Sequence, residues 1–175
     1  MMIGLHHAAL SVPSLDKALA FYCDVMGGTK LTEMMWPAGH EVSDQVLEVQ
    51  SVSGRAAFVQ IGKAFLEIFE FGNCSPREKG PNEPVINHGI SHIAFVVEDI
   101  RSEYDRLETK GVRFHSAPID AGNCTVVAYG RDPFGNVFEI IEIRNDYTLP
   151  NNYIDLLKYK YGISPSAENP VQTDI

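Results

Sequence analysis

The sequence has few of the features that mark exported, membrane-spanning or disulfide-bonded proteins. Its three cysteines, Cys23, Cys74 and Cys124, are widely spaced and form no C-x-x-C pair, which argues against a disulfide framework and against a structural zinc knuckle. No run of about 18 apolar residues occurs, and the N-terminus has no basic segment followed by a long apolar run. We therefore expect a protein of the reducing cytoplasm with no membrane partner.

Basic residues are a minority and form no cluster. The 175 residues include 14 Lys and Arg against 23 Asp and Glu, which gives a formal net charge of -9. This balance argues against nucleic acid or an anionic membrane as a partner. The length suits one well-buried domain or two small modules that share a core, and we expect a single compact unit.

A turn that leads into an apolar strand with two carboxylates is the most informative local pattern. Residues 132–136, Asp-Pro-Phe-Gly-Asn, predict a tight turn, because proline presets φ and the following Gly and Asn tolerate positive φ. In the strand that follows, side chains alternate between faces, so Glu139 lies on the opposite face from Glu142. A buried carboxylate needs a partner or a metal, so an inward-facing glutamate is a candidate site residue.

The same pattern occurs earlier, which suggests an internal duplication. Residues 64–71 form another apolar strand with two carboxylates, Glu67 and Glu70. The starts of the two halves also align, because residues 4–12 and 89–97 share a Gly, a His, an Ala and a Val at matching positions. The matching histidines are His7 and His92. Each half therefore opens with a histidine-bearing strand and closes with a glutamate-bearing strand.

The remaining elements fit two β-α-β-β-β units. In the first half we expect a helix that begins at the N-cap Ser14 and ends at Gly27, strands over 5–12 and 29–36, and two or three further strands over 45–52, 56–61 and 64–71. In the second half, Asp99 caps a helix that Gly111 ends, and strands are expected over 112–115, 125–129 and 137–143. Residues 73–88 read as a linker, and 145–175 as an extension that is partly helical, over 153–161, or disordered.

This layout resembles the vicinal oxygen chelate superfamily, which includes glyoxalase I, bleomycin resistance proteins and extradiol dioxygenases. The resemblance covers residues 3–144, with modules at about 3–72 and 89–144. It implies an α+β fold in which the two modules form a cup-shaped mixed sheet around a metal site. The family's metal ligands fall on His7, Glu67, His92 and Glu139.

The resemblance also implies the chemistry of the site. Two imidazoles and two carboxylates suit a divalent ion such as zinc, nickel, cobalt, iron or manganese. Such an ion polarises a chelated carbonyl, and a carboxylate then removes the adjacent proton through an enediolate. In glyoxalase I-like enzymes a ligand glutamate is the base, which makes Glu139 the first candidate and Glu67 its counterpart. General acid–base catalysis of this kind contributes roughly 10²–10⁴-fold.

Several activities remain open within this family. We expect a metal-dependent lyase or isomerase of the glyoxalase I type, acting on a small carbonyl or thioester substrate as a homodimer. An enzyme like methylmalonyl-CoA epimerase is the alternative, although that pattern usually has Gln at the position of Glu67. An extradiol dioxygenase needs a ligand set of two histidines and one carboxylate, against which Glu67 argues. A non-catalytic resistance protein is the third alternative, and the sequence does not decide whether the modules pair within one chain or between two.

Other polar and aromatic residues carry weaker signals. Arg55 and Arg131 are candidates for binding an anionic substrate tail, although solvated arginines are the more frequent case. The remaining histidines lack the support of the repeat and read as ordinary polar residues: His6, His40, His88 and His115. Three aromatic residues either line an apolar pocket wall or pack in the core: Trp36, Phe58 and Phe69.

Overall fold

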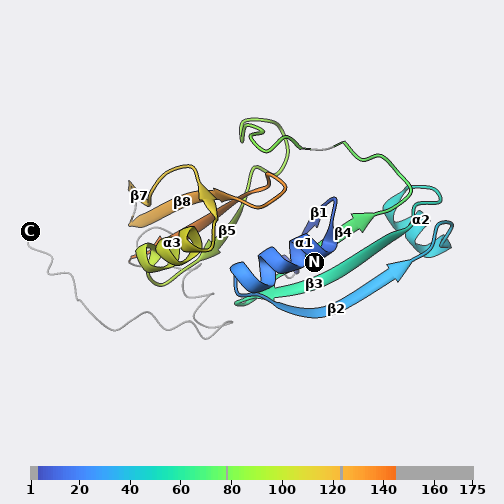
Figure 1. Cartoon of the computed structure of the whole chain (residues 1–175), viewed down its shortest axis with the longest axis horizontal. Helices are drawn as coiled ribbons and strands as arrows, with labels where there is room; N and C mark the ends of the chain where they lie inside the picture. Colours follow the sequence, from blue (N-terminus) through green and yellow to red (C-terminus); the bar gives the residue numbers. More distant parts are fainter. Residues whose placement is uncertain (1–3, 78, 123, 145–175) are drawn as a thin grey trace, which may run out of the picture.

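The computed structural model describes residues 4–77, 79–122 and 124–144, and this part of the chain folds as two modules that each begin with a strand and a helix and end with antiparallel strands (Figure 1). The α+β class is thereby confirmed. The first module consists of β1 (Ala8–Ser11), α1 (Leu15–Leu19), the π-helical turns η1 (Ala20–Val25), β2 (Thr29–Trp36), α2 (Glu41–Leu47), β3 (Gly54–Ile61) and β4 (Ala64–Phe71). The second consists of β5 (Ile93–Val96), α3 (Ile100–Thr109), β6 (Arg113–Phe114), β7 (Ile119–Gly122), β8 (Thr125–Arg131) and β9 (Val137–Ile143).

The strands form two mixed sheets, one in each module. The first has the order β1-β4-β3-β2, and the second has the order β5-β9-β8-β6 with β7 also paired to β8. The first strand of each module runs parallel to the last strand, whereas the other pairings are antiparallel. β1 and β5 are therefore both edge strands of their sheets.

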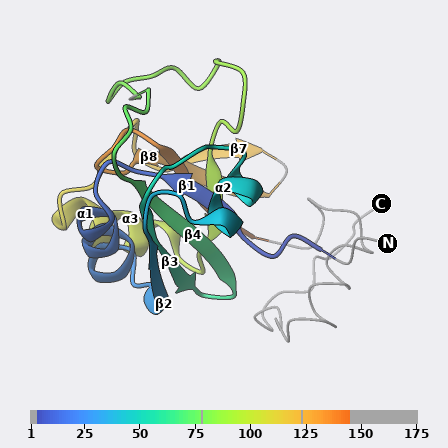
Figure 2. The same cartoon turned by 90° about the vertical axis from the view of Figure 1, so that its right-hand side faces the viewer.

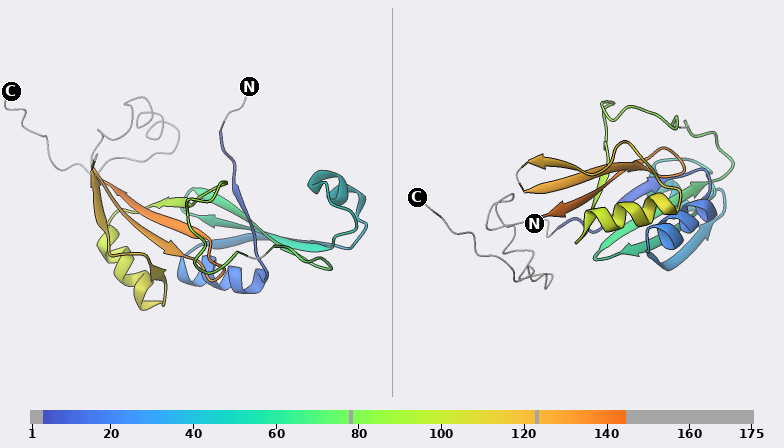
Figure 3. Two further views of the ribbon diagram at one scale, coloured as in Figure 1. Left: turned by 90° about the horizontal axis from the view of Figure 1, so that it is seen from above. Right: turned by 60° about the vertical axis from the view of Figure 1, so that its left-hand side comes forward.

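The long helices of both modules lie on the same side of the sheets, where they cover one shared core (Figure 3). Alternate apolar side chains of β4 and β9 face this core, as the strand periodicity predicts. The core includes Leu15, Leu66, Ile68, Ile100, Leu107, Phe138 and Ile140, each with at most 2% of its surface exposed.

The second glutamate of each repeat accepts a hydrogen bond from the first turn of the helix in its own module. Glu70 accepts a hydrogen bond from the backbone N–H of Leu15 at 2.6 Å, and Glu142 accepts one from that of Ile100 at 2.9 Å. A carboxylate is favourable there, because the first N–H groups of a helix have no internal partner and carry a partial positive charge. In each strand, one glutamate thus binds the start of the helix, and the other, Glu67 or Glu139, lies on the opposite face of the sheet.

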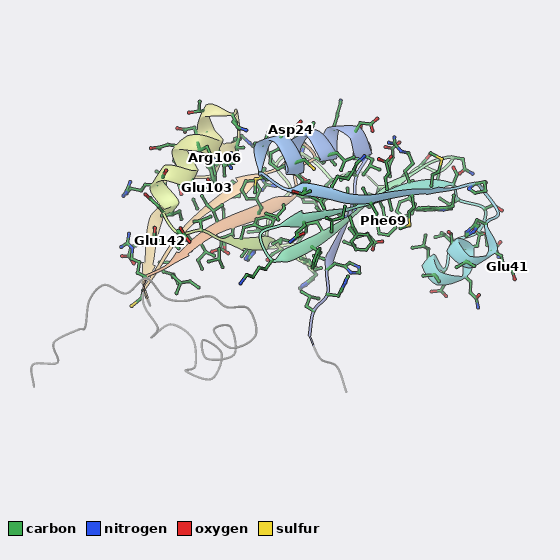
Figure 4. All side chains as sticks on the ribbon, turned by 90° about the horizontal axis from the view of Figure 1, so that it is seen from below. Asp24, Glu41, Phe69, Glu103, Arg106 and Glu142 are labelled. Carbon is green, nitrogen blue, oxygen red and sulfur yellow. The ribbon has the colours of Figure 1, made fainter. Side chains whose placement is uncertain are left out.

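The helix N-caps agree with the sequence prediction. The side chain of Ser14 accepts a hydrogen bond from the backbone of Lys17, and Asp99 accepts two from the first turn of α3. Where α1 and η1 approach α3, Arg106 of α3 donates a 2.8 Å hydrogen bond to the carbonyl of Val25 (Figure 4). This contact joins the two modules on the helical side of the molecule.

The strand predicted over residues 45–52 is wrong. The structure has α2 there, followed by a loop in which Glu48 and Ser51 adopt positive φ values of 53° and 56°. His40 caps the helix at its N-terminus, and the side chain of Asp44 accepts a hydrogen bond from Ser51 at 2.9 Å. These local polar contacts override the β-propensity of Val46 and Val49, which are 77% and 39% exposed.

β7 is a short strand that the sequence analysis did not predict. The segment between β4 and β5 contains no strand or helix among its described residues and projects from the body of the molecule (Figure 2). The helix expected over 153–161 lies outside the described residues. No helix in the described part is long and apolar enough to cross a membrane.

Candidate functional site

The first predicted ligand pair lies on the first sheet. His7 directly precedes β1, and β1 runs parallel to β4 with Ala9 opposite Glu67. This register brings Nε2 of His7 to 3.1 Å from Oε2 of Glu67. The other ring nitrogen, Nδ1, lies 2.8 Å from Nδ1 of His6. The Nε2 atom and the carboxylate therefore meet on the side of the sheet away from α1.

The second pair repeats this arrangement on the second sheet. His92 directly precedes β5, whose Ala94 lies opposite Glu139 of β9. Nε2 of His92 is 3.0 Å from Oε2 of Glu139, and Nδ1 is 2.8 Å from the hydroxyl of Ser91. Glu139 is buried, with 8% of its side chain exposed. The second module thus places a buried carboxylate beside an imidazole.

The structure brings the four predicted ligands together as two pairs and not as one group of four. Within the residues that the structure describes, no group of three or more His, Cys, Asp and Glu side chains is placed to hold a metal ion. Each pair offers one imidazole nitrogen and one carboxylate oxygen. One chain therefore supplies half of the expected ligand set at each of two places.

An aromatic cluster lies on the same face of the first sheet as the His7–Glu67 pair. The rings of Phe69 and Phe71 stack with centroids 5.5 Å apart, and that of Trp36 lies 6.2 Å from each. Phe69 points away from α1 (Figure 4). Trp36 is buried, and its Nε1–H donates a 3.0 Å hydrogen bond to the carbonyl of Val52. Trp36 thus packs in this cluster, whereas the half-buried phenylalanines form a wall beside the pair.

Tyr129 belongs to the second pair and was missed by the sequence analysis. It lies opposite Glu139 in the register of β8 and β9, and its hydroxyl is 3.5 Å from Nε2 of His92. Burial, followed by the charge of Glu139 and a hydrogen bond to it, raises the pKa of Tyr129. The internal repeat could have indicated this residue, because Tyr129 lies opposite Glu139 in the second module as Phe58 lies opposite Glu67 in the first.

The two arginines considered for anion binding are engaged within the protein. Arg55 donates 2.8 Å hydrogen bonds to Asp16 and to Glu33, and these contacts raise the pKa of Arg55. Arg131 donates hydrogen bonds to the carbonyls of Gly135 and Glu83, at 2.8 and 2.9 Å. Both guanidinium groups hold parts of the fold in place, and neither is free to receive a substrate carboxylate without giving up these contacts.

The other histidines have separate structural roles. His6 stacks on Phe65 with centroids 5.6 Å apart, and His40 caps α2. His115 accepts a 3.0 Å hydrogen bond from Nε of Arg131. Burial and the neighbouring charges of Arg131 and Arg113 lower the pKa of His115, so its ring stays neutral at pH 7. His88 is exposed.

A cavity of about 790 Å³ lies between the edge strands of the two modules. Residues of β1 and β5 form two of its walls, and Arg77 and Lys79 of the connecting segment lie beside it. His92 is among the lining residues. The outer edges of β1 and β5, which have no partner strand in the described part of the chain, thus border an open space next to one of the two ligand pairs.

Comparisons with known proteins find relatives of this chain in sequence and in fold. Residues 4–140 match the family described as Glyoxalase/Bleomycin resistance protein/Dioxygenase superfamily. A probable lactoylglutathione lyase from Synechocystis sp. is 31% identical over 144 residues, which cover 79% of this chain and 94% of that protein. A 2-epi-5-epi-valiolone epimerase from Actinomyces sp. is 26% identical, covering 81% and 80%. A glyoxalase family protein from Bacillus cereus has the same fold, with a TM-score of 0.72 at 20% identity, covering 83% and 97%.

Proposed function

Because this chain belongs to the glyoxalase/bleomycin resistance protein/dioxygenase superfamily, we propose that it is a metal-dependent lyase or isomerase of the glyoxalase I type. Its substrate would be a small carbonyl compound. The observation that supports this most strongly is the repeated pairing of His7 with Glu67 and of His92 with Glu139, at 3.1 and 3.0 Å. Structural duplication alone does not require that both copies keep the same pair of metal-binding side chains.

The donor atoms of the two pairs fit a divalent ion. In each pair, the histidine Nε2 and the carboxylate oxygen lie close enough to share one cation, and the nitrogen on the other side of the ring is held by Ser91 or faces His6. Such a second contact on Nδ1 orients the ring so that Nε2 is left for the metal. Two pairs together supply the two imidazoles and two carboxylates that suit zinc, nickel, cobalt, iron or manganese.

The complete site would form between two chains. Both histidines directly precede an edge strand, and neither edge has a partner strand among the residues that the structure describes. Ile90 and Val96, beside and within β5, expose 79% and 70% of their surfaces, so a partner strand would cover apolar side chains as well as unpaired backbone. Placing β1 of one copy along β5 of a second copy would bring His7 and Glu67 toward the other copy's second pair. This proposal makes the protein a homodimer with two equivalent sites.

Each residue of the site would then have a separate role in the reaction. A divalent ion bound by the two pairs would supply Lewis acidity, which makes the hydrogen on the carbon next to a carbonyl more acidic. A site carboxylate, from Glu67 or Glu139, would accept that proton, while the electron pair of the C–H bond moves toward the carbonyl oxygen. The same carboxylate would return the proton to the neighbouring carbon. The half-buried Phe69 and Phe71 would keep water from this side of the site.

An epimerase is the second candidate, and one observation favours it. Arg55 and Arg131 are held in internal contacts, so a tripeptide thiol with two carboxylates has no pre-formed guanidinium partner on either of them. An epimerase would use the same two pairs, with one carboxylate removing the proton and the other delivering a proton to the opposite face of the same carbon. The similarity to an epimerase from Actinomyces sp. is consistent with this alternative.

The proposal is tested by metal content and a kinetic isotope effect. Elemental analysis of the full-length chain, purified without an affinity tag or added metal, should find a divalent metal. The variant with His92→Ala and Glu139→Ala should lose it. Hemithioacetals and acyl-CoA epimers deuterated on the carbon next to the carbonyl would then be compared with the unlabelled compounds for a primary kinetic isotope effect, since both candidate reactions break that C–H bond. If the wild-type protein binds no divalent metal after reconstitution, the catalytic proposal fails and binding of a small molecule without turnover takes its place.

A further inference from the structure

A second cavity, of about 630 Å³, lies where the two modules meet beside α1. One wall comes from α1 and the end of η1, and the other comes from the loop between α3 and β6 and from the turn between β8 and β9. Asp24 and Arg106 mark the neighbouring contact of η1 with α3 in Figure 4. None of the described residues that line this cavity is a proposed metal ligand, so the cavity is separate from the two ligand pairs.

The lining of this cavity is rich in positive charge. Four basic residues line it: Lys17, Lys110, Arg113 and Arg131. Asp132 lines it as well, but its buried carboxylate already accepts hydrogen bonds from Tyr22 and from the turn at residues 134–136. In a protein with a formal net charge of -9, this is an unusual local excess of cations. It indicates a place where an anion would be stabilised.

The four basic side chains have no carboxylate partner in the part of the chain that the structure describes. Arg55 and Arg106, in contrast, each form an ion pair within their own module. Arg113 and Arg131 also lie directly opposite each other in the register of β6 and β8. Like charges at opposite positions destabilise a sheet, so an anion bound beside them would reduce this repulsion.

Contacts with the backbone hold two of the basic groups at the cavity. Nζ of Lys110 donates a hydrogen bond to the carbonyl of Asp24, next to Val25 of the lining. Arg113 donates 2.8 Å hydrogen bonds to the carbonyl of Pro81, another lining residue, and to the side chain that follows it. An ammonium and a guanidinium group have more N–H donors than these contacts use. Lys110 and Arg113 therefore keep donors for a bound anion.

The rest of the lining is mostly apolar. It includes small, aliphatic and aromatic side chains: Ala20, Phe21, Val25, Val112 and Pro133. Arg131 adds its charge, whereas its hydrogen bonds go to the carbonyls of Gly135 and Glu83. A matching ligand thus has several negative charges at one end and an apolar group at the other. A phosphate group suits the charged end, because it carries about two negative charges and several acceptor oxygens.

We propose that this cavity binds a small organic phosphate with an apolar group, and that Lys17, Lys110 and Arg113 bind its phosphate oxygens. The ligand contacts α1 of the first module and the loop between α3 and β6 of the second. It therefore stabilises the folded protein by joining the two modules. This inference does not rest on the proposed function, because the metal ligands lie elsewhere.

Isothermal titration calorimetry of the full-length protein tests the proposal with ADP, pyrophosphate and adenosine as probes. Lys17→Gln combined with Lys110→Gln removes two charges from the cavity. Lys63→Gln combined with Arg101→Gln is the matched control, because it removes the same charge from exposed positions that do not line the cavity. All four side chains are exposed, so both variants should fold, and melting curves check this.

A further control separates this cavity from the proposed metal site, which could itself bind phosphates through a metal. The variant with His92→Ala and Glu139→Ala should bind ADP as the wild-type protein does. Loss of ADP binding in this variant would place the phosphates at the ligand pairs and overturn the inference. A wild-type protein that binds ADP but no divalent metal would contradict the proposed function and leave this inference standing.

We expect ADP to bind more tightly than pyrophosphate, and adenosine not to bind. The variant of Lys17 and Lys110 should bind ADP at least about 10-fold more weakly, because it loses charge-assisted hydrogen bonds. The variant of Lys63 and Arg101 should bind it like the wild type, and ADP should raise the melting temperature of both the wild type and this control. No binding of ADP to the wild type, or equal weakening in the two variants, would overturn the proposal. ADP that binds no more tightly than pyrophosphate would contradict its apolar part.

Discussion

The hydroxyl of Tyr22 donates a 2.9 Å hydrogen bond to Oδ2 of Asp132, and this bond joins the helix of the first module to the β8–β9 turn of the second. Both residues are buried. The other carboxylate oxygen, Oδ1, accepts hydrogen bonds from the backbone N–H groups of Phe134 and Asn136 at 2.9 and 2.8 Å. Asp132 thus shapes its own turn and anchors it to the neighbouring module. The turn motif that stands out in the sequence serves the assembly of the two modules.

Removing the Tyr22 hydroxyl should destabilise the protein. Tyr22→Phe leaves the Asp132 carboxylate with one hydrogen bond fewer in a buried place, and we expect the free energy of unfolding to fall by about 1–3 kcal/mol. Urea unfolding at pH 7 measures this change. Tyr104→Phe is the control, because its hydroxyl bonds to Glu108 on the surface of α3, and it should cost less than about 0.5 kcal/mol. Equal losses in both variants would contradict this account of Tyr22.

The helix-binding glutamates should contribute to stability without contributing to metal binding. Glu142→Gln removes the charge beside the first N–H groups of α3, and Glu70→Gln does so at α1; we expect each to cost about 0.3–1 kcal/mol. Glu108→Gln, in the last turn of α3, should cost nothing, because a negative charge is unfavourable at that end. Chemical denaturation and metal content are measured together. A loss of bound metal in Glu142→Gln would mean that this residue belongs to the site.

Acid should weaken the surface cluster on β2. Hydrogen bonds from Lys30 and Arg55 lower the pKa of Glu33 from 4.5 to about 2. Because the unfolded chain binds this proton more tightly, the stabilisation is complete above pH 4.5 and is lost as the pH falls from 4.5 to about 2. The stability of the wild-type protein should therefore fall more steeply than that of Glu33→Gln over this range. Parallel curves from urea unfolding at pH 2–5 would refute the prediction.

The repeat made much of the fold predictable from sequence. The matching histidine and glutamate strands indicated a duplicated α+β fold. The alternation of side chains along a strand also indicated that Glu67 and Glu139 lie on the opposite sheet face from Glu70 and Glu142. The N-caps Ser14 and Asp99 were predictable for the same reason, since their hydrogen bonds are local. What depends on neighbouring residues in the chain could be predicted.

Features that depend on contacts between residues far apart in the sequence could not be predicted. The hydrogen bond between Tyr22 and Asp132 spans 110 positions, and neither residue alone indicates it. A strand was predicted over residues 45–52, whereas the cap at His40 and the contact of Asp44 with Ser51 favour a helix over residues 41–47 followed by a loop. Tyr129 was missed because its role follows from the register of β8 on β9, and not from a motif.

The central claim is that two chains build each metal site, and subunit mixing tests it most directly. One variant carries His7→Ala and Glu67→Ala, and a second carries His92→Ala and Glu139→Ala; neither alone should bind metal. In a dimer of one chain of each kind, one site has all four ligands intact and the other has none. Co-refolding the two variants in equal amounts should therefore restore about a quarter of the wild-type metal content, because half of the randomly formed dimers are mixed. If mixing restores no metal while the wild-type protein treated in the same way binds it, the four ligands do not come from two chains and the account is contradicted.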